Sequence, residues 1–354
     1  MRLLLGTALI AAGCAEPPFV APTDTLPAAD PGFLLSVSAP TYGLSTDWDM
    51  VSGKLIVGDD FLWSIDLVTR VATRLPSPPI AVSPGIIYLQ VGQETGAIFT
   101  TAGQRDGTHI LSRLDRGAVK QEELSRISSQ AFVISRNGHW LVFSERGTNL
   151  VTRLDTRSGS RVTVPTSVVG NGPYLIDDSG RQLSSGLCTG TCDNGVLDFD
   201  TGLRRTFTAP PTIENIFSIP VRQAAFEGTH LLFLLARAEG STTVYFEWDE
   251  TTRTERVVMR LTVDVPYWTA SCMGWSPTTH SVVAVVRTAD RGYLQDYRYT
   301  VYALVDGVAR PIRTANLFNP TSCSLSPDGK WFAYGNTTGY VSGGGRRYYL
   351  TPVP

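Results

Sequence analysis

Four cysteines in the body of this 354-residue chain are the side chains best suited to covalent or metal chemistry. Cys188 and Cys192 bracket a short CTGTC segment, whereas Cys272 and Cys323 lie far apart in sequence. A zinc site would need further ligands, and no histidine lies near the CTGTC segment. An even number of cysteines in an exported chain favours disulfides, so Cys188, Cys192, Cys272 and Cys323 are disulfide candidates and we expect no bound metal. Cys188 and Cys192 can close a small ring, and the sequence leaves open whether Cys272 pairs with Cys323.

The four histidines carry no recognisable catalytic signature. His139, His230 and His280 each follow a turn at corresponding positions of a repeat described below, and His109 lies in a loop or at a strand end. The chain has no nucleophile elbow, zinc-protease helix, phosphate-binding loop or dinucleotide-binding fingerprint. The acidic run that starts at Asp193 lacks the spacing of an EF-hand loop and indicates turn chemistry. We expect exposed turn histidines, no catalytic residue and no cofactor.

Composition excludes several classes of protein. The formal net charge is −2, so there is no basic surplus to neutralise a nucleic-acid backbone. After the first residues, no stretch approaches the roughly 20 apolar residues that cross a bilayer. Charged residues make up only 18% of a chain that has 33 Gly and 22 Pro, which argues against coiled coils and against disorder.

The first thirteen residues have the composition of an export signal. A positive charge at Arg2 precedes an apolar stretch over residues 3–12, and small residues lead to Cys14. The ending AAGC resembles a bacterial lipobox, with Ala11 in place of the usual Leu. The resemblance implies cleavage before Cys14 and acyl chains on its thiol and amino group, which would anchor the protein to a membrane. Ordinary secretion with cleavage near Ala15 is the alternative.

A proline-rich segment follows the proposed cleavage site. Residues 14–32 contain five prolines and favour extended backbone, which predicts a tether that holds the following domain off the membrane. Ala15, directly after the cysteine, resembles the outer-membrane sorting signal of Gram-negative lipoproteins. We therefore expect a lipid-anchored protein of the bacterial cell envelope, in the outer membrane on its periplasmic face or its surface.

The rest of the chain repeats a strand–turn–strand pattern. The clearest copy, SPDGKWFAYG from Ser326, has a polar turn and then a continuous apolar run; SRNGHWLVFS from Ser135 and SPTTHSVVAVV from Ser276 are similar. A strand covered on both faces must be apolar throughout, so we assign these runs to the core. The turns recur at intervals of 42 to 51 residues, at Gly53, Gly96, Gly138, Gly180, Gly228, Thr279 and Gly329. This period is typical of propeller blades.

A second marker repeats in step with the first. An apolar strand ends in aspartate before another turn at Asp66, Asp115, Asp155, Asp200, Asp249 and Asp306. Each unit therefore reads as strand a, glycine turn, strand b, variable loop, strand c, aspartate turn and strand d. The seventh unit lacks strand d, and residues 33–37 supply an apolar strand that can close the ring.

We therefore predict an all-β fold, a seven-bladed β-propeller of four-stranded antiparallel blades, with six blades as the alternative. The domains are a signal peptide over residues 1–13, a tether over 14–32 and the propeller over 33–354. Cys272 and Cys323 begin strand a of blades 6 and 7, but they are offset by one residue relative to their turns. Because side chains alternate along a strand, their pairing requires a β-bulge.

The turn Ser326 to Lys330 resembles the propeller repeats of the TolB family. The turns at residues 135–139 and 276–280 resemble it in part, and the likeness extends over most of residues 45–350. It implies a propeller that binds proteins in the periplasm or at the surface. It does not imply the partners of TolB, because only a tether precedes the blades here.

Partner binding is expected at the loops between strands b and c and between strands d and a, which emerge on one face of a propeller. Variable loops on a rigid scaffold are common recognition sites. Aromatic and arginine side chains dominate interface energetics, and the candidates of these types are Tyr267, Trp268, Arg291, Tyr293, Tyr297, Arg105, Arg146 and Arg237.

Two functional classes remain open from the sequence. The preferred one is a non-catalytic scaffold that binds an envelope protein, a peptide or a glycan, with no role for nucleic acid. The alternative is a propeller enzyme, such as a lactonase-like hydrolase or a lyase, with its site at the mouth of the central channel. Converging Asp, Glu, Asn or His side chains around the channel would favour the enzyme, and apolar, Ser and Thr side chains would favour the scaffold.

Overall fold

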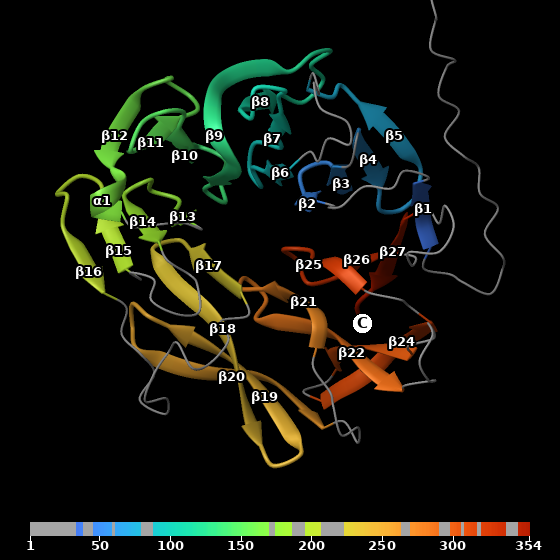
Figure 1. Ribbon diagram of the computed structural model, residues 1–354. Coiled ribbons are helices and arrows are strands. Elements are labelled where there is room, and N and C mark those ends of the chain that lie inside the picture. Colours follow the sequence, from blue (N-terminus) through green and yellow to red (C-terminus); the bar gives the residue numbers. More distant parts are fainter. Residues whose placement is uncertain are drawn as a thin grey trace, which may run out of the picture.

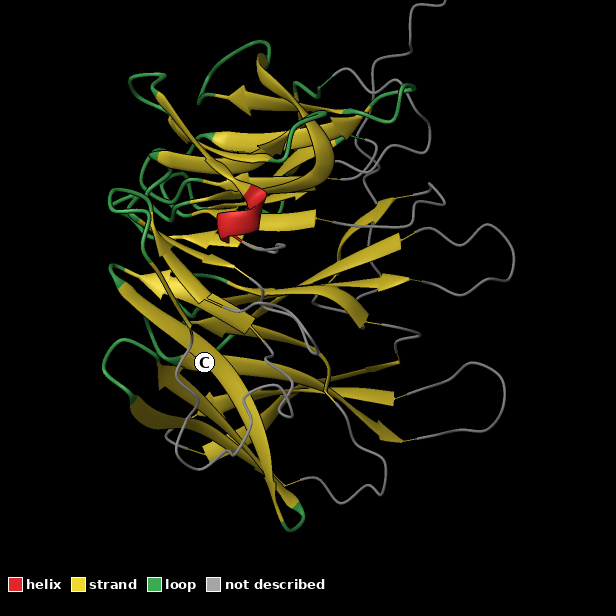
Figure 2. Ribbon diagram, turned by 60° about the vertical axis from the view of Figure 1, so that its left-hand side comes forward, coloured by secondary structure: helices red, strands yellow, loops and turns green. Residues whose placement is uncertain are grey.

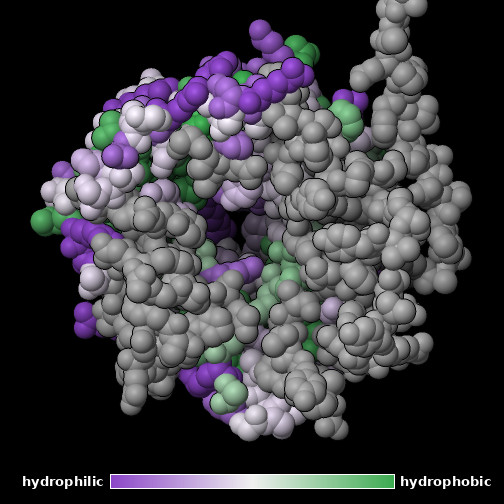
Figure 3. Space-filling view, in the orientation of Figure 1, coloured by the Kyte–Doolittle hydropathy of each residue, from purple (hydrophilic) through white to green (hydrophobic). Residues whose placement is uncertain are grey.

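The computed structural model describes residues 33–37, 45–58, 61–78, 88–169, 174–185, 195–206, 223–262, 270–289, 298–305, 308–316, 320–337 and 346–354. These residues form seven four-stranded antiparallel blades around a central channel (Figure 1). Figure 3 shows the channel as a hollow at the centre of the ring. The predicted seven-bladed propeller is therefore confirmed.

Blade 1 is a separate sheet, whereas blades 2 and 3 share a strand. Blade 1 contains β2 (Ser45–Asp49), β3 (Lys54–Gly58), β4 (Leu62–Asp66) and β5 (Ala72–Leu75). The long strand β9 (Glu122–Ile134) is both strand d of blade 2 and strand a of blade 3, which joins the two blades into a seven-stranded sheet. The other strands of that sheet are β6 (Tyr88–Val91), β7 (Ile98–Gly103), β8 (His109–Leu114), β10 (Trp140–Glu145), β11 (Leu150–Asp155) and β12 (Arg161–Pro165).

Blades 4, 5 and 6 are separate four-stranded sheets, and the short helix α1 (Thr166–Val169) precedes them. Blade 4 contains β13 (Tyr174–Ile176), β14 (Gln182–Ser185), β15 (Gly195–Asp198) and β16 (Arg204–Thr206). Blade 5 contains β17 (Gln223–Glu227), β18 (His230–Glu239), β19 (Thr242–Asp249) and β20 (Thr254–Thr262). Blade 6 contains β21 (Ala270–Ser276), β22 (Ser281–Ala289), β23 (Arg298–Val305) and β24 (Val308–Asn316).

Blade 7 is closed by the amino-terminal strand, as the sequence predicted. Its own strands are β25 (Pro320–Leu325), β26 (Trp331–Thr337) and β27 (Arg346–Pro352), and β1 (Phe33–Val37) fills the outermost place. β1 pairs antiparallel with β27, from Phe33 opposite Tyr349 to Val37 opposite Arg346. Figure 1 shows the two strands side by side. With β1 in place, blade 7 has four strands like the other blades, and the chain's first strand closes the ring.

The core lies between the blades. The strand-b residues Leu141, Val142 and Phe143 are all fully buried, because neighbouring blades cover both faces of their sheet. Leu231 and Leu235 of β18 are buried in the same way. Continuous apolar runs therefore replace the alternation expected of a half-exposed strand, and the assignment of these runs to the core is confirmed.

The glycine turns have the backbone conformation that the repeat predicts. All six predicted glycines adopt a positive φ, between 59° and 83°. The seventh position was wrong, because His280 and not Thr279 takes the left-handed conformation, with a φ of 53°. Strand β22 begins five residues after Ser276, as β10 and β26 do after Ser135 and Ser326, so the left-handed residue of this turn lies one position nearer to its strand.

Aspartate side chains accept turn N–H groups at Asp66, Asp155 and Asp249 as expected, with one correction in blade 4, and the predicted Asp306 lies outside the described residues. Asp249 Oδ1 accepts the backbone N–H groups of Thr251 and Thr252, and Asp66 Oδ1 does the same two and three residues later. In blade 4 this role belongs to Asp198 and not to Asp200, since Asp198 ends β15 and accepts the N–H of Asp200 itself. The side chain of a turn aspartate thus satisfies backbone donors that the turn leaves unpaired.

Side chains tie the innermost strands of neighbouring blades together. Asp47 Oδ2 accepts the Val91 N–H at 2.7 Å and joins blade 1 to blade 2. Gln90 accepts the Ile134 N–H and joins blade 2 to blade 3. Further ties are Gln223 Nε2 to Met273 O, 3.0 Å, between blades 5 and 6, and Trp48 Nε1 to Ser324 Oγ, 2.7 Å, between blades 1 and 7. Each one holds two adjacent blades in register.

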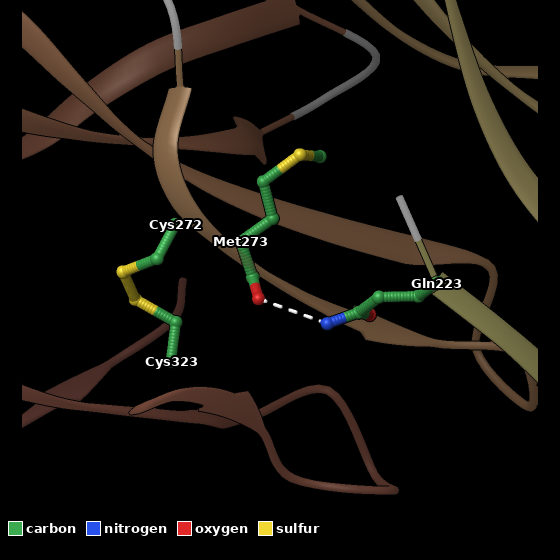
Figure 4. The surroundings of a disulfide bond; sticks show 4 residues. All are labelled: Gln223, Cys272, Met273 and Cys323. Atoms are coloured by element: carbon green, nitrogen blue, oxygen red, sulfur yellow. Dashed lines mark hydrogen bonds between the residues drawn. A yellow bond between two sulfur atoms is a disulfide. The ribbon is translucent and has the colours of Figure 1, made fainter. Parts of the chain in front are cut away.

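A disulfide joins blades 6 and 7 at the same radius. Cys272 of β21 is bonded to Cys323 of β25, with 5.7 Å between their Cα atoms (Figure 4). Pairing is irregular between Ala270 and Cys272 and again between Thr321 and Ser324. The predicted disulfide and the predicted bulge are both confirmed. The other predicted pair, Cys188–Cys192, lies outside the described residues.

The turns between strands a and b and between strands c and d gather on one face, here called the turn face. Figure 2 shows most of the described turns on that side of the ring. The connectors between strands b and c and between strands d and a emerge on the opposite face, here called the loop face. Among the described residues, no helix is long and apolar enough to cross a membrane.

Candidate functional site

Most of the predicted partner-binding residues lie outside the described residues. This applies to Tyr267, Trp268, Arg291, Tyr293 and Tyr297, and also to the predicted lipidation site, Cys14. In chain order, Tyr267 and Trp268 fall between β20 and β21, and Arg291, Tyr293 and Tyr297 fall between β22 and β23. The predicted assignment of these segments to the loop face is consistent with that order.

Arg105 and Arg146 lie on the loop face in adjacent blades. Arg146 Nη1 forms an ion pair with Asp106 Oδ2 at 3.0 Å, and both side chains are about half exposed. The Thr108 hydroxyl and backbone N–H hold the pKa of Asp106 below its usual range, and Arg146 adds to this effect. The pair links the b–c loops of blades 2 and 3, while Arg105 is exposed beside it.

Arg237, the third described candidate, is more enclosed. Its guanidinium contacts Glu239 at 3.0 Å and Glu255 at 2.7 Å, and it lies 4.7 Å from the centre of the Phe246 ring. The hydrogen bonds that Arg237 donates, above all the one to Glu255, raise its pKa above the usual value. Arg237 therefore holds three strands of blade 5 together, and its exposed fraction of 24% leaves a limited surface for a partner.

A cavity of about 200 Å³ lies among the innermost strands and their following turns. Its described lining is largely apolar and comes from strand a or the following turn of blades 2 to 7, and includes Val133, Ile176, Phe226, Trp275 and Leu325. Gln93, Ser276 and Thr278 add neutral polar groups, and Arg136 is the charged side chain in the described lining. Within this part of the channel the composition matches the one expected of a scaffold.

A set of titratable side chains lies on the turn face, between blades 5 and 6. Glu247 of β19 is 3% exposed and accepts two hydrogen bonds from blade 6, one from Trp275 Nε1 at 2.6 Å. The other comes from His280, whose Nδ1 lies 2.7 Å from Glu247 Oε2. Because a buried carboxylate is costly without donors, these two bonds anchor blade 6 against blade 5.

A second histidine–carboxylate pair faces the same cavity. His230 Nδ1 lies 2.8 Å from Asp249 Oδ2. Burial raises the pKa of Asp249, but the bonds from His230, Thr252 and Thr251 outweigh it and leave that pKa below its usual value. The cavity has a volume of about 360 Å³ and is lined by Glu227, His230, Leu232, Glu247, Asp249, Thr254, Arg256 and His280.

This pocket corrects the expectation that the histidines are separate, exposed turn residues. His230 is exposed, but His280 is only 30% exposed and shares a cavity with it. His139 and His109 are half-buried elsewhere, and burial lowers the pKa of His109. A histidine oriented by a carboxylate is able to transfer protons. Among the described residues, however, no three His, Cys, Asp or Glu side chains are arranged to hold a metal ion.

The sequence contained one signal for the pocket that was not used. Glu247 and Asp249 stand two residues apart on one strand, so their side chains point to the same face of blade 5. That face is turned toward blade 6, whose turn carries His280. Only the cross-blade packing brings these groups together.

Comparisons with known proteins identify the fold class. No protein-family model and no curated protein sequence matches the chain. Among solved structures, the chain is similar to an oligogalacturonate lyase in complex with manganese, with a TM-score of 0.58, 13% identity and coverage of 87% of this chain and 88% of the lyase.

Two further structures are similar in the same way. They are an oligogalacturonate lyase from Vibrio parahaemolyticus (TM-score 0.57, 11% identity, 88% of this chain and 89% of that chain) and the β-propeller domain of Swd1 from Myceliophteria thermophila (TM-score 0.52, 13% identity, 90% and 99%). The chain is therefore a β-propeller protein. At these identities the likeness shows the fold alone, and the fold is shared by an enzyme and by a propeller domain of another kind.

Proposed function

We propose that this protein is a lipid-anchored propeller of the bacterial cell envelope that binds another protein, a peptide or a glycan through its loop face without catalysing a reaction. The observation that carries the proposal is the contrast between the two faces. The turn face is formed by short turns of similar length, and inter-blade ties fix the strands beneath it.

The connectors of the loop face vary far more. Strand β9 runs unbroken from blade 2 into blade 3, whereas residues 207–222 separate β16 from β17. Residues 290–297, which include Arg291, Tyr293 and Tyr297, separate β22 from β23. A rigid ring that carries connectors of different length and aromatic composition is the usual basis of recognition by a propeller.

The composition of the channel lining supports a scaffold role over an enzymatic one. Its described turn-face end is lined by apolar side chains with Ser, Thr and Gln, and one arginine. An enzyme with a site in the channel would require acid and base groups that converge on it. The similarity to a lyase does not favour catalysis, because it extends to the fold only.

Membrane anchoring is proposed from the sequence. The lipobox-like ending at Cys14 and the proline-rich residues 15–32 would place the propeller at the end of a short extended tether. A tethered scaffold meets partners within reach of one membrane, so the proposal places the partner in the envelope as well.

Crosslinking in intact cells tests the binding role. The Trp268→Ala/Tyr293→Ala double variant is expected to lose a specific crosslinked species while its thermal unfolding stays unchanged, because both residues lie in connectors outside the blades. Val68→Ala and Val119→Ala, on exposed turn-face valines, serve as matched controls and should keep that species. An unchanged crosslinking pattern in the double variant would remove these residues from the proposal.

Labelling with a fatty acid tests the anchor separately. Incorporation into the wild-type chain and none into Cys14→Ser is the expected result. Equal labelling of the two chains, or no labelling of either, would defeat the anchor but leave the loop-face proposal standing.

A further inference from the structure

The cavity among the innermost strands, here called the axial cavity, combines an apolar wall with one cationic side chain. Its volume is about 200 Å³, and its described lining comes from blades 2 to 7, so it lies at the centre of the ring. The apolar wall includes Val133, Ile176, Phe226 and Leu325, and Arg136 is the one charged residue in the described lining. An apolar cavity with a few convergent polar groups is the usual form of a small-molecule site.

Arg136 brings a positive charge that no described carboxylate pairs with. The residue is half-buried, and within the described part of the chain its guanidinium group takes part in no ion pair and no hydrogen bond. Asp178 holds the corresponding position in the turn of blade 4, but it lies outside the lining, and its Oδ1 accepts the Asn137 N–H at 2.8 Å. The guanidinium group of Arg136 therefore keeps its hydrogen-bond donors for an anion.

The neutral polar groups of the lining add a donor and no acid. Gln93 Nε2 already donates to a main-chain carbonyl at 2.7 Å, and Ser276 Oγ donates to Pro327 O at 2.7 Å. The hydroxyl of exposed Thr278 lines the same cavity and has no hydrogen-bond partner among the described residues. Because the described lining contains Arg136 and no acidic side chain, it favours an anion and disfavours a cation.

The turn that carries Arg136 does not need an arginine for its fold. Ser135 and Ser326 begin turns with the same bonds: each serine N–H donates to the carbonyl five residues later, and each serine carbonyl accepts the N–H of the glycine three residues later, all at 2.8 Å. Arg136 holds the place of Pro327 in blade 7 and of Pro277 in blade 6. Proline presets the backbone for such a turn. An arginine at this place therefore favours a role in binding over a role in folding.

We propose that the axial cavity binds a small amphipathic carboxylate, whose anionic group pairs with Arg136 and whose apolar group packs on the wall. One guanidinium group balances one negative charge and can bind a carboxylate through two parallel hydrogen bonds. A cavity of about 150 Å³ holds a benzene molecule, so 200 Å³ leaves room for one ring or a short alkyl chain beside the carboxylate. The site is separate from the connectors proposed to bind a partner on the loop face.

Calorimetric titration at constant ionic strength tests the proposal with three probes. Phenylacetate has both the charge and the apolar group, acetate lacks the apolar group, and 2-phenylethanol lacks the charge. Phenylacetate is expected to bind saturably and about tenfold more tightly than either control probe. Arg136→Met keeps an apolar stem but removes the charge, so its affinity for phenylacetate should fall about tenfold, while its affinity for 2-phenylethanol should equal that of the wild type.

Two further variants separate binding from folding. Arg136→Pro introduces the residue of blades 6 and 7, so it should lose the same affinity while its thermal unfolding stays at the wild-type temperature. Arg256→Met is the matched control, because Arg256 is exposed on β20 and lines the pocket between blades 5 and 6 instead of the axial cavity. This variant should bind phenylacetate as the wild type does.

Three results would overturn the proposal. They are no saturable binding of phenylacetate, equal affinities of the wild type for phenylacetate and 2-phenylethanol, and a loss of affinity in Arg256→Met as large as that in Arg136→Met.

Discussion

Asp47 offers the sharpest test of how the inner strands hold the ring together. The side chain is half-buried between β2 and β6, where Oδ2 accepts the Val91 N–H at 2.7 Å and Oδ1 accepts the Trp48 N–H at 2.8 Å. Burial raises the pKa of this carboxyl to about 6, and the two backbone hydrogen bonds offset only part of that rise. Ionised Asp47 is therefore a cost to the folded state at neutral pH.

The sign and size of the effect follow from linkage. Protonation of Asp47 favours the folded state, so its contribution to stability is fully present below the ordinary carboxyl pKa of 3.8 and is lost as the pH rises to about 6. A rise of about two pKa units corresponds to a loss of about 3 kcal/mol across that range, and solvent access to the side chain makes this an upper limit.

The perturbation is Asp47→Asn. The amide cannot ionise, and its oxygen still accepts the Val91 N–H, although the Trp48 N–H loses its acceptor at a cost of about 1 kcal/mol. The difference in unfolding free energy between wild type and variant should therefore shift by about 2–3 kcal/mol in favour of the variant between pH 4 and pH 7.

Urea unfolding at half-unit pH steps measures that difference. Asp66→Asn is the control of opposite sign, because hydrogen bonds from Thr69 hold the pKa of Asp66 below its usual value. Asp66 thus stabilises the fold above pH 4, and its variant should lose stability relative to the wild type as the pH rises. Parallel pH profiles for wild type and Asp47→Asn would refute the reasoning.

Three further predictions concern the ring and the pocket between blades 5 and 6. The Cys272→Ser/Cys323→Ser variant should be less stable than the oxidised wild type by about 4 kcal/mol, because the cross-link spans 51 residues; urea unfolding with and without a reductant measures this, and no change on reduction of the wild type would contradict the bonded state. His280→Ala should destabilise the protein by about 1–3 kcal/mol, since buried Glu247 loses a donor. His280→Gly should cost about 1 kcal/mol less than His280→Ala, because the backbone at this position has a φ of 53°, and the reverse order of the two variants would show that the left-handed backbone carries no strain.

The repeat was readable because its two markers satisfy local backbone requirements. A glycine with positive φ and an aspartate that accepts N–H groups two and three residues later act within single turns, so each can be recognised without its neighbours. Thr279 was wrongly predicted as the left-handed residue and Asp200 as the turn aspartate. In each case the true residue, His280 or Asp198, lies one or two positions away in the same turn. The closing strand, residues 33–37, was predictable because the seventh repeat lacked a strand.

The pocket between blades 5 and 6 could not be predicted from the sequence in the same way. It depends on which side chains of one blade face the next, and the lateral packing of blades is not encoded at a fixed spacing. His230 and His280 are 50 residues apart, yet they share a cavity because one follows the first turn of blade 5 and the other the first turn of blade 6. The period predicts equivalent places in neighbouring blades, but it does not predict which side chains meet across two blades.

The disulfide and the closing strand together explain how blade 7 is retained. Strands β21 and β25 both contain irregular pairing near their cysteines, which removes ladder hydrogen bonds from the inner edge of blades 6 and 7. The Cys272–Cys323 bond spans that weakened edge, while β1 continues along the chain into β2 and connects blade 7 to blade 1. Blade 7 is thus covalently connected to both neighbours, whereas the aromatic stack of Tyr334 on Tyr349, with ring centres 5.1 Å apart, packs its interior. Opening of the ring therefore requires loss of the β1–β27 pairing or parting of two blades at their tied inner strands, and reduction of the disulfide alone should lower stability without opening the channel.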